Sequence, residues 1–164
     1  MIGDIIMAMV KENKGDNRRI NHALKVYGLA RCIAEAEGMT GDALITVEAT
    51  AVLHDIGIAH CEKAFGKCTG KMQEEYGPAI AQRILEDEQM SEQSKERVLY
   101  LIAHHHTYDN IDGIDYRIIV EADFLVNAEE KNISEAAFSK AYDKFFRTRS
   151  AKELAAAMFE LGAE

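Results

Sequence analysis

The chain has 164 residues, a length typical of one domain and sufficient to bury a hydrophobic core. Its composition is 48% hydrophobic and 29% charged, which excludes a protein that is mainly disordered. The 19 Lys and Arg residues against 28 Asp and Glu residues give a net charge of −9. This charge argues against binding to bulk nucleic acid or to an anionic membrane, because such proteins need a basic surface. A small phosphorylated substrate, which needs only a few local cations, is not excluded.

The sequence carries no pattern typical of export or membrane insertion. No apolar run approaches the ~20 residues of a membrane-spanning helix, and residues 1–14 resemble an amphipathic helix and not a secretion signal. Since the three cysteines are an odd number, we expect reduced thiols and a cytoplasmic protein. The amphipathic first segment is also a surface on which a second copy can pack, so a homo-oligomer is an open alternative.

Helical patterns run through the whole chain, which has one proline and many good helix formers. In residues 18–37 the apolar positions recur at steps of three and four, and Gly38 is expected to end that helix. Further helices are predicted over residues 42–55 (with Asp42 as cap), 71–88, 91–106 (opened by Ser91), 116–130 and two segments between 134 and 162. Residues 57–70 contain three glycines and are predicted as a loop. The expected fold class is all-α, a single bundle of six to eight helices.

Side chains that can bind metals or transfer protons concentrate in a few places. His22 lies within the first long helix, the pair His54-Asp55 ends the second, and residues 104–106 are three consecutive histidines at the end of a later helix. Asp123 is embedded in the apolar segment EADFLVN. Alone, His22 or Asp123 is most simply a satisfied core residue, because buried polar groups need partners. Together, two imidazoles and two carboxylates match the ligands of one divalent ion with positions open for water and substrate.

Three segments resemble the motifs of the HD superfamily of metal-dependent phosphohydrolases. AVLHDIG (51–57) resembles its signature, RINHALKV (19–26) its first-histidine motif, and EADFLV (121–126) the helix with its late aspartate. They occur in the order typical of the family. The resemblance implies one HD-type domain over residues 1–164, with a motif core at 19–126 and C-terminal helices at 132–162 packed on it.

The resemblance also implies a metal site. Its ligands in this sequence are His22, His54, Asp55 and Asp123. The divalent ion can be Mn, Fe, Mg, Zn, Co or Ni. Relatives often hold a second metal with further histidines: here Tyr76, in YGPAIA, stands at one such position, and His105, or else His104, stands at the other. These three residues are candidates for a second metal or for contact with a phosphate.

The implied reaction is hydrolysis of a phosphate ester or anhydride by a metal-activated water, with a nucleotide or another small phosphorylated metabolite as substrate. Asp55 and His105 are the catalytic candidates, and His105 can act as a general acid or phosphate donor where no second metal binds. Arg18 and Arg19, about one turn before His22, are candidates for binding the substrate phosphate, since a guanidinium matches phosphate oxygens. Two alternatives stay open: a di-iron oxygenase on the same scaffold, and a non-catalytic module that binds a metal or nucleotide.

Overall fold

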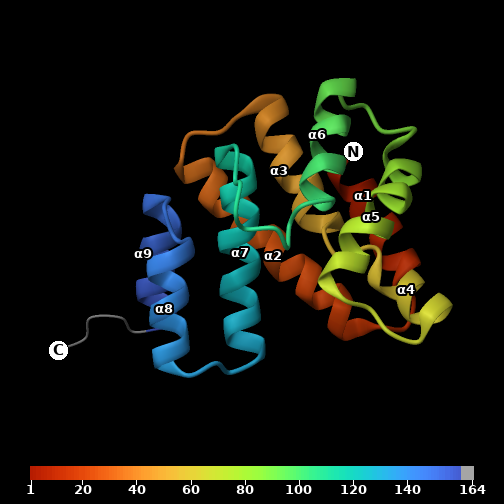
Figure 1. Cartoon of the computed structure of the whole chain (residues 1–164). Helices are drawn as coiled ribbons and strands as arrows, with labels where there is room; N and C mark the ends of the chain where they lie inside the picture. The colour runs from red at the N-terminus through yellow and green to blue at the C-terminus, as the bar shows by residue number, and fades with distance from the viewer. Residues whose placement is uncertain (160–164) are drawn as a thin grey trace.

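A computed structural model of the chain describes residues 1–159, which form nine α-helices and no strand (Figure 1). The helices are α1 (Ile2–Glu12), α2 (Asn17–Ala36), α3 (Gly41–Leu53), α4 (Ile58–Phe65), α5 (Gly70–Leu85), α6 (Glu92–Ile102), α7 (Ile114–Glu130), α8 (Glu135–Phe145) and α9 (Arg149–Met158). The predicted all-helical class is confirmed. Residues 57–70, predicted as a loop, contain α4, which explains why nine helices are found where six to eight were expected. The predicted helix end at Gly162 lies outside the described residues.

Helix α3 is the central helix of the bundle. It lies among the other helices (Figure 1) and contacts α1, α2, α6 and α7, and its residues 46–53 are all buried. A helix that is buried on every side is enclosed by other elements. The buried part of α3 is its C-terminal part, so the residues that follow it, His54 (fully buried) and Asp55 (partly buried), also lie in the interior.

The stretch Gly41–Phe65 is long and apolar enough to cross a membrane by length and composition, since an 18-residue segment of it has a mean hydropathy of 1.2. However, 67% of that segment is buried inside the fold. Core helices meet the same criterion, and α3 is surrounded by four other helices. Burial in the core accounts for the apolar composition of this stretch.

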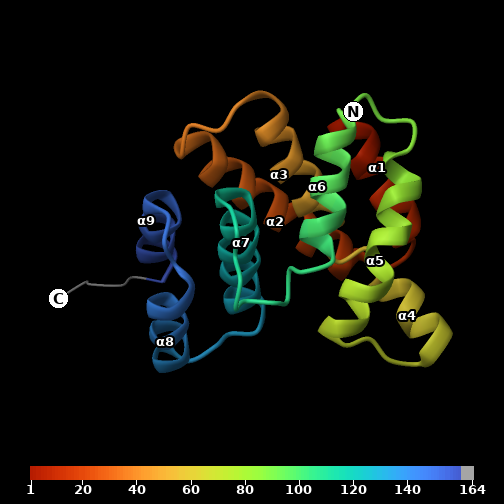
Figure 2. The same cartoon turned by 45° about the horizontal axis from the view of Figure 1, so that its top comes forward.

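Two hydrophobic clusters lie on opposite sides of α2 and α3. One joins these helices to α7, α8 and α9 and includes Phe138 and Phe146, and the other joins them to α1, α5 and α6 and includes Met9 and Leu85. Figure 2 shows α7–α9 on one side of α2 and α3, and α1, α4, α5 and α6 on the other. Because α2 and α3 contribute residues to both clusters, close packing on two sides holds these helices, and the side chains that they carry into the interior, in place.

Helix boundaries follow local signals in the sequence. Gly38 has φ +83°, the left-handed conformation that glycine adopts most easily, and α2 ends just before it, as predicted. Ser91 caps α6 as predicted, since its side chain accepts a hydrogen bond from the Ser94 amide. Helix α3 is preceded by Thr40 as its N-cap residue, so Asp42, the predicted cap, lies in its first turn.

The turn after α3 packs directly on α5 because both segments carry a glycine at the contact. A Cβ atom on Gly57 would lie 3.0 Å from the backbone nitrogen of Gly77, which is tighter than nine in ten real Cβ contacts, and a backbone atom cannot easily move aside. Any side chain at Gly57 would therefore push α5 away. This close contact fixes the end of α3, where His54 and Asp55 lie, against the helix that completes the site.

Candidate metal centre

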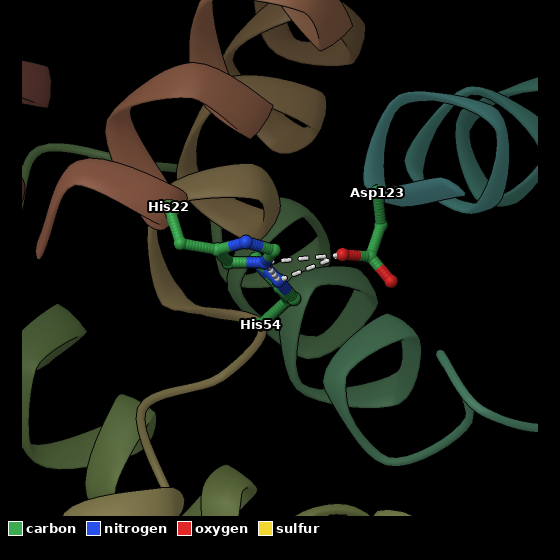
Figure 3. Close-up of side chains that lie close together, drawn as sticks. All are labelled: His22, His54 and Asp123. Carbon is green, nitrogen blue, oxygen red and sulfur yellow. Dashed lines mark hydrogen bonds and ion pairs between the residues drawn. The ribbon is translucent and has the colours of Figure 1, made fainter. Parts of the chain in front are cut away.

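Three side chains from three separate helices converge in the interior. The Nε2 atom of His22 lies 3.3 Å from Nε2 of His54 and 3.2 Å from Oδ1 of Asp123. The Nε2 atom of His54 lies 3.5 Å from the same Asp123 oxygen. Figure 3 shows both imidazoles directed toward one another and toward the carboxylate. Donor atoms from α2, the end of α3 and α7 thus surround one point, although His22 and Asp123 are 101 residues apart.

Hydrogen bonds on the outer side of each imidazole fix which nitrogen faces inward. Nδ1 of His54 lies 2.8 Å from the carbonyl oxygen of Ala51, and a carbonyl only accepts, so Nδ1 donates. Nδ1 of His22 lies 2.9 Å from a carboxylate oxygen of Glu130, which likewise accepts. Both Nε2 atoms are therefore directed at the centre, as in histidines that bind metals.

A second group lies beside the first and consists of Asp55, His105 and His106, whose ligand atoms all lie within 4.8 Å of one another. His105 is held in the same way as His54, since its Nδ1 donates to the carbonyl oxygen of Ile102 at 2.8 Å. The side-chain oxygen of Gln73 lies 2.8 Å from Nε2 of His106 and 3.3 Å from Nε2 of His105. An amide oxygen thus completes a second set of hard and borderline donor atoms.

Asp55 connects the two groups. Its Oδ2 atom lies 3.6 Å from Nε2 of both His22 and His54, and its Oδ1 atom lies 3.5 Å from Nε2 of His105. One carboxylate oxygen is thus directed at each group. Asp55 would therefore contribute a ligand oxygen to a metal held by either group.

The charges at the centre favour a cation. Burial by itself lowers the pKa of His54, but the charges of Asp55 and Asp123 raise it to about 9. Burial by itself raises the pKa of Asp123, but hydrogen bonds and charge from two histidines hold it well below its ordinary value. Burial and the charge of a neighbouring histidine lower the pKa of His106 to about 4, so its ring is neutral near pH 7. The ionised carboxylates therefore attract positive charge, and a metal that binds here displaces protons from the histidines.

A cleft of about 850 Å³ opens from both groups, and Asp55, Asp123 and His106 line it. Four cationic side chains also line the cleft: Arg18, Arg19, Lys25 and Lys131. The two arginines predicted to bind a phosphate thus lie at the mouth of the site, and the two lysines are additions from the structure. A cleft with carboxylate and imidazole ligands at one end and cations along its walls fits an anionic ligand that also contacts a metal.

The four cations differ in their pairing. Arg19 forms ion pairs of 3.0 Å with Asp16 and 3.1 Å with Glu62. Lys25 pairs with Glu129 at 3.0 Å and with Glu130 at 3.1 Å. Within residues 1–159, Arg18 and Lys131 form no ion pair. These last two side chains can contact a phosphate without first breaking an existing interaction.

His104 and Tyr76 lie outside both groups. Helix α6 ends before the three histidines, so they lie in a turn, and the ring of His104 lies apart from those of His105 and His106. His104 Nδ1 donates to the carbonyl oxygen of Tyr100 at 2.7 Å, and its ring stacks on the Tyr100 ring with centroids 4.2 Å apart. The Tyr76 ring packs against Phe65, with centroids 5.2 Å apart. Gln73, about one turn before Tyr76 on α5, is the residue of this helix that contacts His105 and His106.

Two further contacts come from α7 and have a signal in the sequence. Asn127 Nδ2 donates to Oδ1 of Asp123 at 2.7 Å, and Glu130 holds His22. Asp123, Asn127 and Glu130 follow the spacing i, i+4, i+7 and so share one face of the helix. That polar stripe on an otherwise buried helix was readable from the sequence.

The model of the HD domain family matches residues 19–157, which span both ligand groups. The chain belongs to the HD domain family. HD domain proteins are a superfamily of metal-dependent phosphohydrolases, and the inward-facing Nε2 atoms and ionised carboxylates fit the divalent metal that this membership implies. No curated protein and no solved structure matches the chain.

We expect Glu130→Ala to weaken divalent metal binding to this HD domain about 10- to 100-fold, because it removes the carboxylate that orients His22. Titration with Mn²⁺ in a calorimeter measures the effect. Glu129→Ala is the matched control, since the neighbouring Glu129 is exposed and also pairs with Lys25, but makes no bond to a ligand histidine. Equal metal affinities for the two variants would contradict the role of Glu130.

Proposed function

We propose that this HD domain protein is a metal-dependent hydrolase of a phosphate ester or anhydride, and that its substrate is a nucleotide or another small phosphorylated metabolite. The observation that carries the proposal is the position of Asp55, which faces both ligand groups at a cleft that Arg18 and Lys131 also line. A bound divalent ion supplies an acidified water, with a pKa lowered from about 16 to about 7, and neutralises phosphoryl charge.

The side chains of the chain divide into those that hold the metal and those that hold the substrate. The imidazoles of His22 and His54 are held from outside by hydrogen bonds, so they need no rearrangement to act as ligands. Arg18 and Lys131 bind and orient phosphate oxygens from the wall of the cleft. His105, whose Nε2 atom faces Asp55, is a ligand or proton donor in the second group.

A second candidate function is oxidation at a pair of irons. The observation that favours it is the second group, in which Asp55, His105 and His106 lie together and Asp55 is shared with the first. Metal analysis separates the two functions: two irons with oxygen consumption support oxidation, and phosphate release with another divalent ion supports hydrolysis. The third hypothesis is a non-catalytic module that binds a metal or nucleotide, and the complete set of converging ligands disfavours it.

The test of the proposed function is phosphate release from a panel of nucleoside mono- and diphosphates, dinucleoside polyphosphates and simple phosphomonoesters. With Mn²⁺ loaded, we expect release from at least one compound, a fall of at least about a hundredfold in EDTA, and recovery when Mn²⁺ is returned. Heat-treated protein taken through the same steps is the control. Absence of release with each of Mn, Fe, Mg, Zn, Co and Ni, or undiminished release in chelator, would overturn the proposal.

A further inference from the structure

A smaller cavity, of about 240 Å³, lies beside the metal centre. It shares His106, Asp123, Asn127 and Lys131 with the large cleft, so the two spaces adjoin at the metal ligands. The remaining walls of the small cavity are apolar or aromatic: Tyr108, Val120, Phe124, Ala128, Ile133 and Phe145. One end of this cavity is therefore polar and charged, and the rest is suited to an apolar group.

Three aromatic rings form much of the apolar wall. The ring of Phe145 has its centroid 4.9 Å from that of Tyr108 and 6.2 Å from that of Phe124, with interplanar angles of 55° and 41°. Tyr108 is 40% exposed, so its ring is accessible from solvent at the wall of the cavity. Its position two residues after His106 means that one turn supplies both a metal-site residue and the cavity wall.

We propose that this cavity binds a flat aromatic ring of the substrate while the phosphate of the same molecule lies in the adjoining cleft. The inference rests on the proposed function and narrows its substrate class to phosphate compounds of an aromatic ring system, which includes nucleobases. Aromatic walls favour stacking of a flat ring. A polyol would lose its hydrogen bonds to water in this cavity, because the apolar walls offer no replacement partners. Lys131 lines both spaces, so its ammonium can contact the phosphate of a molecule whose ring lies in the small cavity.

The first test compares 1-naphthyl phosphate with glycerol 2-phosphate in the metal-loaded protein and in Tyr108→Ala. We expect Tyr108→Ala to lower kcat/KM for the naphthyl ester about tenfold and to leave the glycerol ester within about twofold. Phe65→Ala is the matched control, because Phe65 is also an exposed aromatic residue, at 47%, and lines neither cavity. An equal loss for both esters would overturn the inference, as would an equal loss for hexyl phosphate, which would indicate a site for any apolar tail.

The second test measures the ring alone and separates this inference from the proposed function. Titration with 1-naphthol, followed by its fluorescence, needs no turnover. We expect wild-type protein to bind it and Tyr108→Ala to bind it about tenfold more weakly. If no phosphoester is hydrolysed but this difference is found, the proposed function fails and the aromatic site stands. If esters are hydrolysed but 1-naphthol binding is absent or unchanged by Tyr108→Ala, the aromatic site is overturned and the proposed function stands.

Discussion

Asp55→Asn is expected to lower kcat/KM for the hydrolysed phosphoester by at least about a thousandfold, or about 4 kcal/mol of transition-state stabilisation. The substitution keeps the size of the side chain but removes its negative charge. It also replaces one of the two oxygens, of which one faces each ligand group. It affects both groups at once, which no other single substitution at the centre does. Steady-state kinetics with saturating Mn²⁺ measure the loss.

The control for this variant is Asp87→Asn, which removes a carboxylate of the same kind from an exposed position just after α5, outside both cavities. It should keep wild-type kcat/KM within about twofold, as surface substitutions usually do. Circular dichroism and the melting temperature show whether Asp55→Asn keeps its fold. A folded Asp55→Asn protein with more than a tenth of wild-type activity would contradict the role of Asp55 as a ligand.

His106→Ala is expected to remove one of two bound metal ions and to lower hydrolysis about a hundredfold, whereas His104→Ala keeps both ions and near-normal activity. The two residues are separated by a single position in the chain, yet His106 lies with Asp55 and His105 while His104 stacks on Tyr100. Metal content after gel filtration and kcat/KM are measured on each variant. Two ions in His106→Ala, or the loss of one in His104→Ala, would show that the turn presents a different histidine.

The chemistry of the first ligand group was predictable from the sequence. His22, His54, Asp55 and Asp123 lie within segments that resemble the motifs of one family, and the structure brings all four together. Helix positions were also predictable, because periodicity and capping residues depend on near neighbours. The buried stretch 46–53 of α3 leads directly into His54 and Asp55, so the sequence favoured a position inside the protein for this pair.

The second group was harder to predict because it depends on geometry that residue order does not determine. Whether His104, His105 or His106 reaches Asp55 is decided by the turn after α6. Gln73 and Tyr76 are about one turn apart on α5, and the packing of α5 against its neighbours decides which of them meets the histidines. The aromatic cavity joins residues from α7, α8 and the segments around them, and no local pattern marks such a set.

The most direct test is a crystal structure of the metal-loaded protein with anomalous scattering. We predict one anomalous peak among the Nε2 atoms of His22 and His54 and the carboxylates of Asp55 and Asp123, and a second beside His105 and His106. Peaks at other places, or His22 and Asp123 too far apart to bind one ion, would contradict the central claim that these helices converge to hold a metal.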